Sequence, residues 1–227
     1  MTDFLVFLPI LLFSVVAHEY AHAWTAFRQG DPTAYQLGRL TLNPVPHIDP
    51  MMSVVVPVGL WLLSHGAFTF GAAKPVPINP RNFRNYRRGD LIVSSAGIVT
   101  NLILAVACAL LFAALGIVGQ ALPAAGGLLG ILQRMMFFGI FLNFILAVFN
   151  LVPLPPLDGS HLFDHLLPPA LGARYRAIGR FGFLVLLVTF MVPGLSGVWN
   201  VLLWPADQAF RVTLSAVGGF ALPGVVR

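Results

Sequence analysis

The chain contains four long apolar stretches, and these constrain its fold more than any other feature: Phe4–Ala17, Leu91–Val118, Leu128–Val152 and Phe181–Leu203. A helix needs about 20 mainly apolar residues to cross a bilayer, and three of the stretches reach that length. Only 9% of the 227 residues are charged, whereas soluble domains carry about 25%. The sequence therefore predicts an all-α, multi-spanning integral membrane protein with about four to six membrane segments.

The chain shows no internal repeat and no insertion long enough for a second domain. We expect 1–227 to form one membrane-embedded domain, with a core over about 4–167 and one or more additional helices over 168–227. Between the first helix and the later ones, Phe68–Ile78 is rich in proline and does not have a helical pattern. This composition predicts a small β-hairpin or membrane-associated strand region.

The basic residues indicate how the chain is oriented. Suppose that the N-terminus lies outside and that Met51–Leu63 enters and leaves the bilayer on one side. Ten basic residues then face the cytoplasm, and only Arg134, Arg211 and Arg227 lie outside. The ten are Arg28, Arg39, Lys74, Arg81, Arg84, Arg87, Arg88, Arg174, Arg176 and Arg180. This split favours the re-entrant arrangement. Because these charges set topology, the net charge of +5 does not indicate a nucleic-acid partner.

A metal-binding pattern, His18-Glu19-Tyr20-Ala21-His22, lies near the end of the first helix. The i, i+4 spacing places both imidazoles on one helix face, and Glu19 lies close enough to act as a base toward water on that metal. His18 comes about 14 residues after the apolar stretch begins, which is about 21 Å along a helix. Ionisable groups at such a depth in the membrane mark function. The sequence therefore predicts a catalytic metal centre here.

A catalytic zinc takes a third protein ligand, and Asp158 is the best candidate. It follows the proline-rich end of an apolar stretch, on the side where the first helix presents its histidines. His161 and His165 form a rival pair with the same i, i+4 spacing, which could supply a ligand or hold a second metal. His47 and His65 have no partner at such spacing, and we expect them at the interface.

Both motifs, HEYAH in the first span and NLVPLPPLDG later, resemble those of the site-2 protease family of intramembrane zinc metalloproteases. The resemblance is closest to the compact bacterial subgroup without PDZ or CBS domains, and it implies the bacterial inner membrane. The orientation given by the basic residues places the active site toward the cytoplasm. It implies that His18, His22 and Asp158 bind one Zn²⁺ and that Glu19 is the catalytic base. The family's G-P-x-x-N motif falls on Gly97–Asn101, with Ile98 in place of proline. Asn101 and Asn150 would bind substrate or stabilise an oxyanion, although buried amides also hold membrane helices together.

The resemblance implies that the partners are the lipid bilayer and a transmembrane protein substrate, which must unwind before it is cut. We expect the edge of the strand region, Phe68–Ile78, to receive it by strand addition. Two alternatives are a non-proteolytic metal-binding membrane protein, such as a zinc transporter, and a catalytically silent scaffold. The sequence leaves open whether 212–226 is a half-span and whether the chain forms a homo-oligomer.

Overall fold

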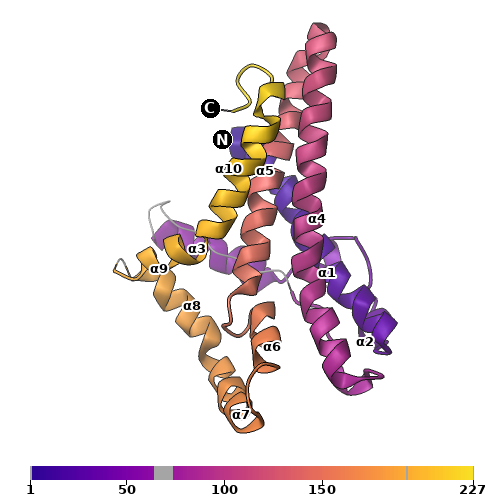
Figure 1. Cartoon of the computed structure of the whole chain (residues 1–227), viewed down its shortest axis with the longest axis vertical. Coiled ribbons are helices and arrows are strands. Elements are labelled where there is room, and N and C mark those ends of the chain that lie inside the picture. The colour runs from indigo at the N-terminus through magenta and orange to yellow at the C-terminus, as the bar shows by residue number, and fades with distance from the viewer. Residues whose placement is uncertain (1, 64–73, 193, 227) are drawn as a thin grey trace.

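Three long helices form the body of the computed structural model, which describes residues 2–63, 74–192 and 194–226 (Figure 1). They are α1 (Thr2–Gln29), α4 (Tyr86–Ala121) and α5 (Gly126–Leu151). Together with the short η4 (Pro123–Ala125), they supply three segments long and apolar enough to cross a membrane. The prediction of an α-helical integral membrane protein is confirmed.

Close packing of small residues holds this bundle together. The α4–α5 hairpin runs antiparallel, and α1 lies against both helices (Figure 1). A Cβ at Gly139 of α5 would lie 2.6 Å from the Cys108 Sγ of α4, so only glycine permits this approach. Around this contact lies an apolar core of Ile10, Cys108, Ala109, Phe112, Ile140, Leu142, Leu222 and Val225.

Short elements connect α1 to α4. They are α2 (Thr33–Gln36), η1 (Val45–His47), the π-helical η2 (Pro50–Val55), α3 (Val56–Leu63) and η3 (Pro80–Asn82). The Lys74 N–H donates to the His47 carbonyl at 2.8 Å, so residue 74 lies beside the end of η1. Similarly, the Arg84 N–H donates to the Gln29 carbonyl at 2.9 Å, which places the start of α4 beside the end of α1.

The prediction of a β-hairpin or strand region is wrong, because residues 2–63, 74–192 and 194–226 contain no strand. Residues 68–73 of the predicted segment lie outside the described residues. The rest is irregular, and its backbone N–H groups bond to scattered partners. Val76 donates to the Glu19 carboxylate and Asn79 to the Asp31 carboxylate. Because prolines alternate with these donors, no strand ladder can form.

Three helices of the described chain are long and apolar enough to span, fewer than the four to six membrane segments predicted, a number that also included shorter segments such as the re-entrant Met51–Leu63. The stretch Phe181–Leu203 forms two short helices, α8 (Gly182–Met191) and α9 (Ser196–Leu202), rather than one span. Pro193 and Gly194, the strongest helix breakers, lie between them in the sequence. A helix of ten residues extends about 15 Å, half the thickness of the hydrocarbon core.

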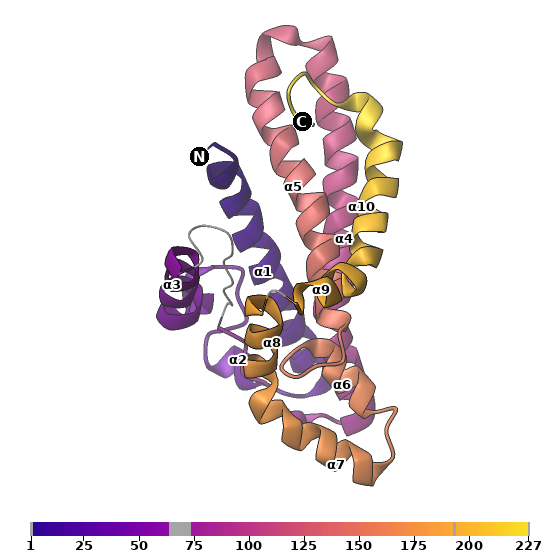
Figure 2. The same cartoon turned by 90° about the vertical axis from the view of Figure 1, so that its left-hand side faces the viewer.

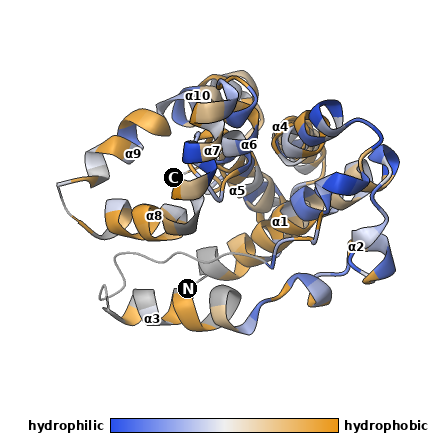
Figure 3. Cartoon of the chain, turned by 90° about the horizontal axis from the view of Figure 1, so that it is seen from below, coloured by the Kyte–Doolittle hydropathy of each residue, from blue (hydrophilic) through white to orange (hydrophobic). Residues whose placement is uncertain are grey.

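The remaining helices form a C-terminal arm. It comprises α6 (Asp158–Asp164), α7 (Pro169–Ile178), η5 (Gly179–Phe181), α8, α9, α10 (Trp204–Val217) and η6 (Gly218–Phe220). The α6 and α7 helices lie at the end of the molecule where α4 begins, and α10 returns alongside α4 and α5 (Figure 2). Seen from that end, hydrophilic residues gather around α2 and hydrophobic ones along α1, α8 and α9 (Figure 3). The segment 212–226 is therefore the end of α10 and a tail that packs on the α4–α5 hairpin.

Candidate metal centre

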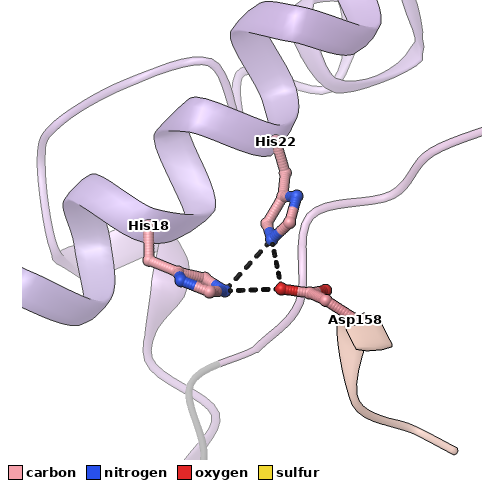
Figure 4. Close-up of side chains that lie close together, drawn as sticks. All are labelled: His18, His22 and Asp158. Carbon is pink, nitrogen blue, oxygen red and sulfur yellow. Dashed lines mark hydrogen bonds and ion pairs between the residues drawn. The ribbon is translucent and has the colours of Figure 1, made fainter. Parts of the chain in front are cut away.

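The two histidines of the α1 motif point the same way from successive turns of the helix (Figure 4). Both side chains are buried, and their Nε2 atoms lie 3.0 Å apart. The i, i+4 spacing alone brings the two rings to one side. Their burial depends on α4, which covers this face.

Asp158 reaches the histidines from the first turn of α6. Its Oδ2 lies 3.3 Å from the Nε2 of His18 and 3.2 Å from the Nε2 of His22. Gly159 makes this possible, because a Cβ there would lie 2.2 Å from the Leu151 carbonyl oxygen at the end of α5. The Asp158 side chain is only 19% exposed, so its carboxylate oxygen meets the two rings with little solvent around it.

The other ring nitrogen of each histidine has an acceptor. The Nδ1 of His22 lies 2.8 Å from the Val93 carbonyl oxygen, and the Nδ1 of His18 lies 2.6 Å from the Asn101 Oδ1. Since these oxygens only accept, each Nδ1 carries the proton and each Nε2 presents a lone pair. Two lone pairs and a carboxylate thus converge. Among them, Asp158 Oδ2 is buried without a hydrogen-bond partner.

A zinc ion fits this set of acceptors. Tetrahedral ligands at about 2.0–2.1 Å from zinc lie about 3.3 Å from one another. The three contacts between His18, His22 and Asp158 measure 3.0, 3.2 and 3.3 Å. Two imidazoles and one carboxylate are an established ligand set for catalytic zinc, and each ring has the outer acceptor that such ligands need.

Glu19 lies beside this set and is half-buried. Its Oε2 accepts the backbone N–H of Val76 at 2.8 Å. Pro75 and Pro77 have no N–H, so Val76 is the only backbone donor in that tripeptide. The guanidinium of Arg39 in turn holds this segment by donating to the Lys74 carbonyl at 2.8 Å. The connection between α1 and α4 therefore positions the Glu19 carboxylate.

Gly97 lets α4 approach the two histidines. A Cβ at this position would lie 2.4 Å from His18 Cε1 and 2.5 Å from His22 Nε2. Asn101 is one turn further along the same helix, and its amide oxygen contacts His18. Ile98, which replaces the family's proline, is buried within a continuous α4. The two residues of the motif that match the family are therefore the two that approach the histidines of α1.

The other predicted residues lie elsewhere. The Asn150 amide nitrogen donates to the Leu146 carbonyl of its own helix at 3.0 Å. His161 and His165 contact Asp90 of α4, at 3.5 and 2.7 Å, rather than the metal ligands. His47 is buried within the protein, and its Nε2 lies 3.0 Å from the Thr41 carbonyl oxygen. His65 lies outside the described residues.

Sequence reasoning missed several groups around the site. Ser14 and Asn143 are isolated polar residues within apolar helices, and such residues are a recognisable signal of function or helix contact. The Val93 carbonyl and the Val76 N–H belong to the backbone, so no pattern of side chains points to them. Asp90 precedes an apolar stretch and has no partner nearby in the sequence.

A two-histidine, one-carboxylate set beside a glutamate, buried among membrane helices, is typical of one class of protein, the membrane-embedded zinc metalloproteases. The family model of "Peptidase family M50" matches residues 117–191, which include Asp158. "Putative zinc metalloprotease YwhC" of Bacillus subtilis is 39% identical over 203 residues, which cover 88% of this chain and 85% of that protein. "Putative zinc metalloprotease Rip2" of Mycobacterium tuberculosis is 34% identical over 197 residues, 86% of this chain and 71% of that protein. This chain belongs to peptidase family M50. No solved structure matches it.

Proposed function

We propose that this chain is a zinc-dependent intramembrane endopeptidase in which His18, His22 and Asp158 bind the metal and Glu19 is the general base. One observation carries the assignment of residues. The Nε2 atoms of His18 and His22 and the buried Oδ2 of Asp158 lie 3.0–3.3 Å from one another inside a bundle of membrane helices. Glu19 follows His18 directly in the sequence. Membership of peptidase family M50 supports the same reaction.

Each side chain has a separate role in hydrolysis. When bound, zinc acts as a Lewis acid that polarises a carbonyl oxygen and lowers the pKa of water. Glu19 accepts the proton of the attacking water and returns it to the amine that leaves. The Val76 N–H holds the Glu19 carboxylate in place during both transfers. His18 and His22 are almost fully buried, so bulk water has little access to this side of the site.

We propose that the substrate is a transmembrane segment of another protein, which must lose its helical hydrogen bonds before Glu19 can act. Asp158 begins α6, which lies with α7 at the end of the molecule where α1 ends and α4 begins (Figure 1). Arg28 is in the last turn of α1 and Arg176 in the last turn of α7, so basic residues gather at this end. The contact between Lys74 and His47 supports a segment that enters and leaves on this same side. By the positive-inside rule this end faces the cytoplasm and the N-terminus lies outside. The bacterial relatives support a location in the bacterial inner membrane.

The decisive experiment compares the parent protein with Glu19→Gln and His18→Ala. Each would be co-expressed with a panel of single-span membrane proteins tagged at both ends, and the purified proteins would be assayed for zinc. We expect Glu19→Gln to retain zinc and lose cleavage, and His18→Ala to lose both. Cleavage that survives Glu19→Gln would contradict the proposal. Zinc flux into liposomes that is independent of Glu19 would favour a transporter instead.

A further inference from the structure

A continuous chain of buried polar groups crosses the bundle behind the metal site. It starts at Ser14 of α1, one helical turn before His18, and passes through Asn143 of α5 and Asn101 of α4. The three side chains have 0% exposed surface. The Asn143 Nδ2 lies 2.9 Å from Ser14 Oγ, and Asn101 Nδ2 lies 2.8 Å from Asn143 Oδ1. This series of hydrogen bonds ends at His18 Nδ1, 2.6 Å from Asn101 Oδ1.

A backbone carbonyl fixes the donor-to-acceptor direction of this series of hydrogen bonds. Asn143 lies 2.9 Å from the carbonyl oxygen of Gly139, which can only accept a hydrogen bond. The Asn143 amide must therefore turn its NH₂ group toward Gly139 and its oxygen toward Asn101. Asn101 then has to donate its own NH₂ to Asn143 and present its oxygen to His18. The proton of the His18 ring is consequently required on Nδ1.

We propose that Asn143 is a positioning residue that acts through Asn101 to keep His18 in the tautomer able to bind zinc. This inference rests on the proposed function, because it concerns the metal ligand named there. With the proton on Nε2 instead, His18 would direct an N–H at His22 and Asp158. No lone pair would then remain on Nε2 to bind the metal. The amides lie in a region of low dielectric, where hydrogen bonds of fixed direction discriminate strongly between tautomers.

A matched control exists in the same bundle. Gln133 of α5 also has 0% exposed surface and also joins helices through its amide. Its Nε2 donates to the carbonyls of Phe112 and Phe220, both at 2.9 Å, and its Oε1 accepts the Leu222 N–H at 2.8 Å. None of these bonds leads to His18. Replacing either amide with leucine removes a comparable set of buried hydrogen bonds, but only one replacement affects the metal ligand.

The test uses the whole protein in detergent and measures zinc affinity by competition with a chelator for the parent, Asn143→Leu, Asn101→Leu, the double variant and Gln133→Leu. We expect Asn143→Leu to weaken zinc binding by about 10–100-fold, as the loss of an outer-shell partner does. Gln133→Leu should bind within about threefold of the parent, even where its melting temperature falls equally. Because Asn143 acts through Asn101, the double variant should bind no more weakly than Asn101→Leu alone.

A second measurement reads the tautomer directly. In metal-free protein labelled with ¹⁵N-histidine, the ring nitrogen shifts of His18 should show Nδ1–H in the parent and a mixture of tautomers in Asn143→Leu. If Asn143→Leu does not fold, Ser14→Ala removes one bond of the chain and should give a smaller change in the same direction. Equal losses of affinity in Asn143→Leu and Gln133→Leu, or an unchanged tautomer, would overturn the inference. A parent protein that binds no zinc would refute the proposed function instead.

Discussion

The molecule contains two pairs of histidines with the same i, i+4 spacing, and they are used differently. In α1, both rings bond through Nδ1 to oxygens of α4, and both Nε2 atoms converge with the Asp158 carboxylate. In the second pair, His161 of α6 and His165, which caps the end of that helix, each contact a separate oxygen of Asp90. The His161 side chain is 56% exposed, whereas that of His18 is 10% exposed.

The difference shows that helical spacing alone does not define a metal site. The His18 and His22 rings are each held from behind by an acceptor, which leaves both lone pairs free for a metal. Within residues 2–63, 74–192 and 194–226, no acceptor bonds the other ring nitrogen of His161 or His165, and Asp90 lies between the two histidines. Asp90 therefore joins α6 to α4, whereas Asp158 converges with the two Nε2 atoms in the set of groups that we propose to bind zinc. The second pair nevertheless affects the position of Asp158, because the contacts with Asp90 hold α6, which carries Asp158, against α4.

The largest effect that we predict separates the two pairs directly. His22→Ala should abolish zinc binding and cleavage, because two remaining ligands cannot hold the ion against a chelator. The loss should exceed the about 10–100-fold that removal of an outer partner causes. The matched change at the other pair, His161→Ala, should leave one zinc per chain by elemental analysis. Two zinc ions in the parent, with one lost in His161→Ala, would contradict the contrast.

Gly97→Ala should have the next largest effect, because the added Cβ collides with both rings. We expect zinc affinity to fall by about 10–100-fold as His18 and His22 are displaced from their acceptors. Gly130→Ala in α5 is the control, since its Cβ would meet only Val225 Cγ2, at an ordinary 3.9 Å. Equal zinc affinity in the two alanine variants would show that α4 can move away without cost.

A moderate effect should follow from Asp90→Asn, which removes the charge that ties α6 to α4. Asp90 and the His165 ring are both about nine-tenths buried and lie 2.7 Å apart. Losing such a charge-assisted hydrogen bond costs about 1.5–3 kcal/mol. Because α6 then docks less firmly and carries Asp158 with it, zinc affinity should fall by about tenfold or less.

The control for Asp90→Asn is Asp207→Asn, which makes the same change in an exposed pair with Arg211 in α10. Such pairs contribute about 0–1 kcal/mol, so thermal stability and zinc affinity should both stay near those of the parent. Asp90→Asn behaving like Asp207→Asn would show that α6 is positioned by its loop alone.

The smallest effect is a dependence of stability on pH. Contact with the Asp90 carboxylate raises the pKa of His161 above the ordinary 6.5, against the opposing effect of burial, and the charges of Asp158 and Asp164 add to the rise. A group whose pKa is raised by folding stabilises the fold fully below pH 6.5, and this contribution disappears as the pH rises through the folded pKa. The metal-free parent should therefore lose stability relative to His161→Gln as the pH is raised.

Melting temperatures of the parent and His161→Gln measured at about pH 6 and about pH 8.5 test this dependence. The difference between the two proteins should shrink by at most about 3 °C, since a partly exposed ion pair contributes little. A difference that stays constant, or that grows with pH, would show that protonated His161 does not hold α6 to α4.

Much of the site could be predicted because its residues form local patterns. His18, Glu19 and His22 fall within one helical turn, and Asp158 follows an apolar stretch at a sharp, proline-rich turn. The strand region was predicted wrongly because prolines that discourage helix were taken to favour a strand edge. In the structure, Val76 and Asn79 use their N–H groups on carboxylates of α1 and the turn that follows it.

Hydrophobicity and short-range spacing are encoded over a few residues, so the membrane class, the two motifs and the resemblance to the family are evident before any coordinates are known. Which histidine pair converges with Asp158 and which pair contacts Asp90 depends on the packing of helices that are far apart in the chain. This packing also decides that Asn101 faces His18 while Asn150 bonds within its own helix. The physical reason is that hydrogen bonds have a reach of about 3 Å. Whether residues 71 or 83 positions apart fall within that reach depends on how closely α4 packs on α1, which Gly97 permits.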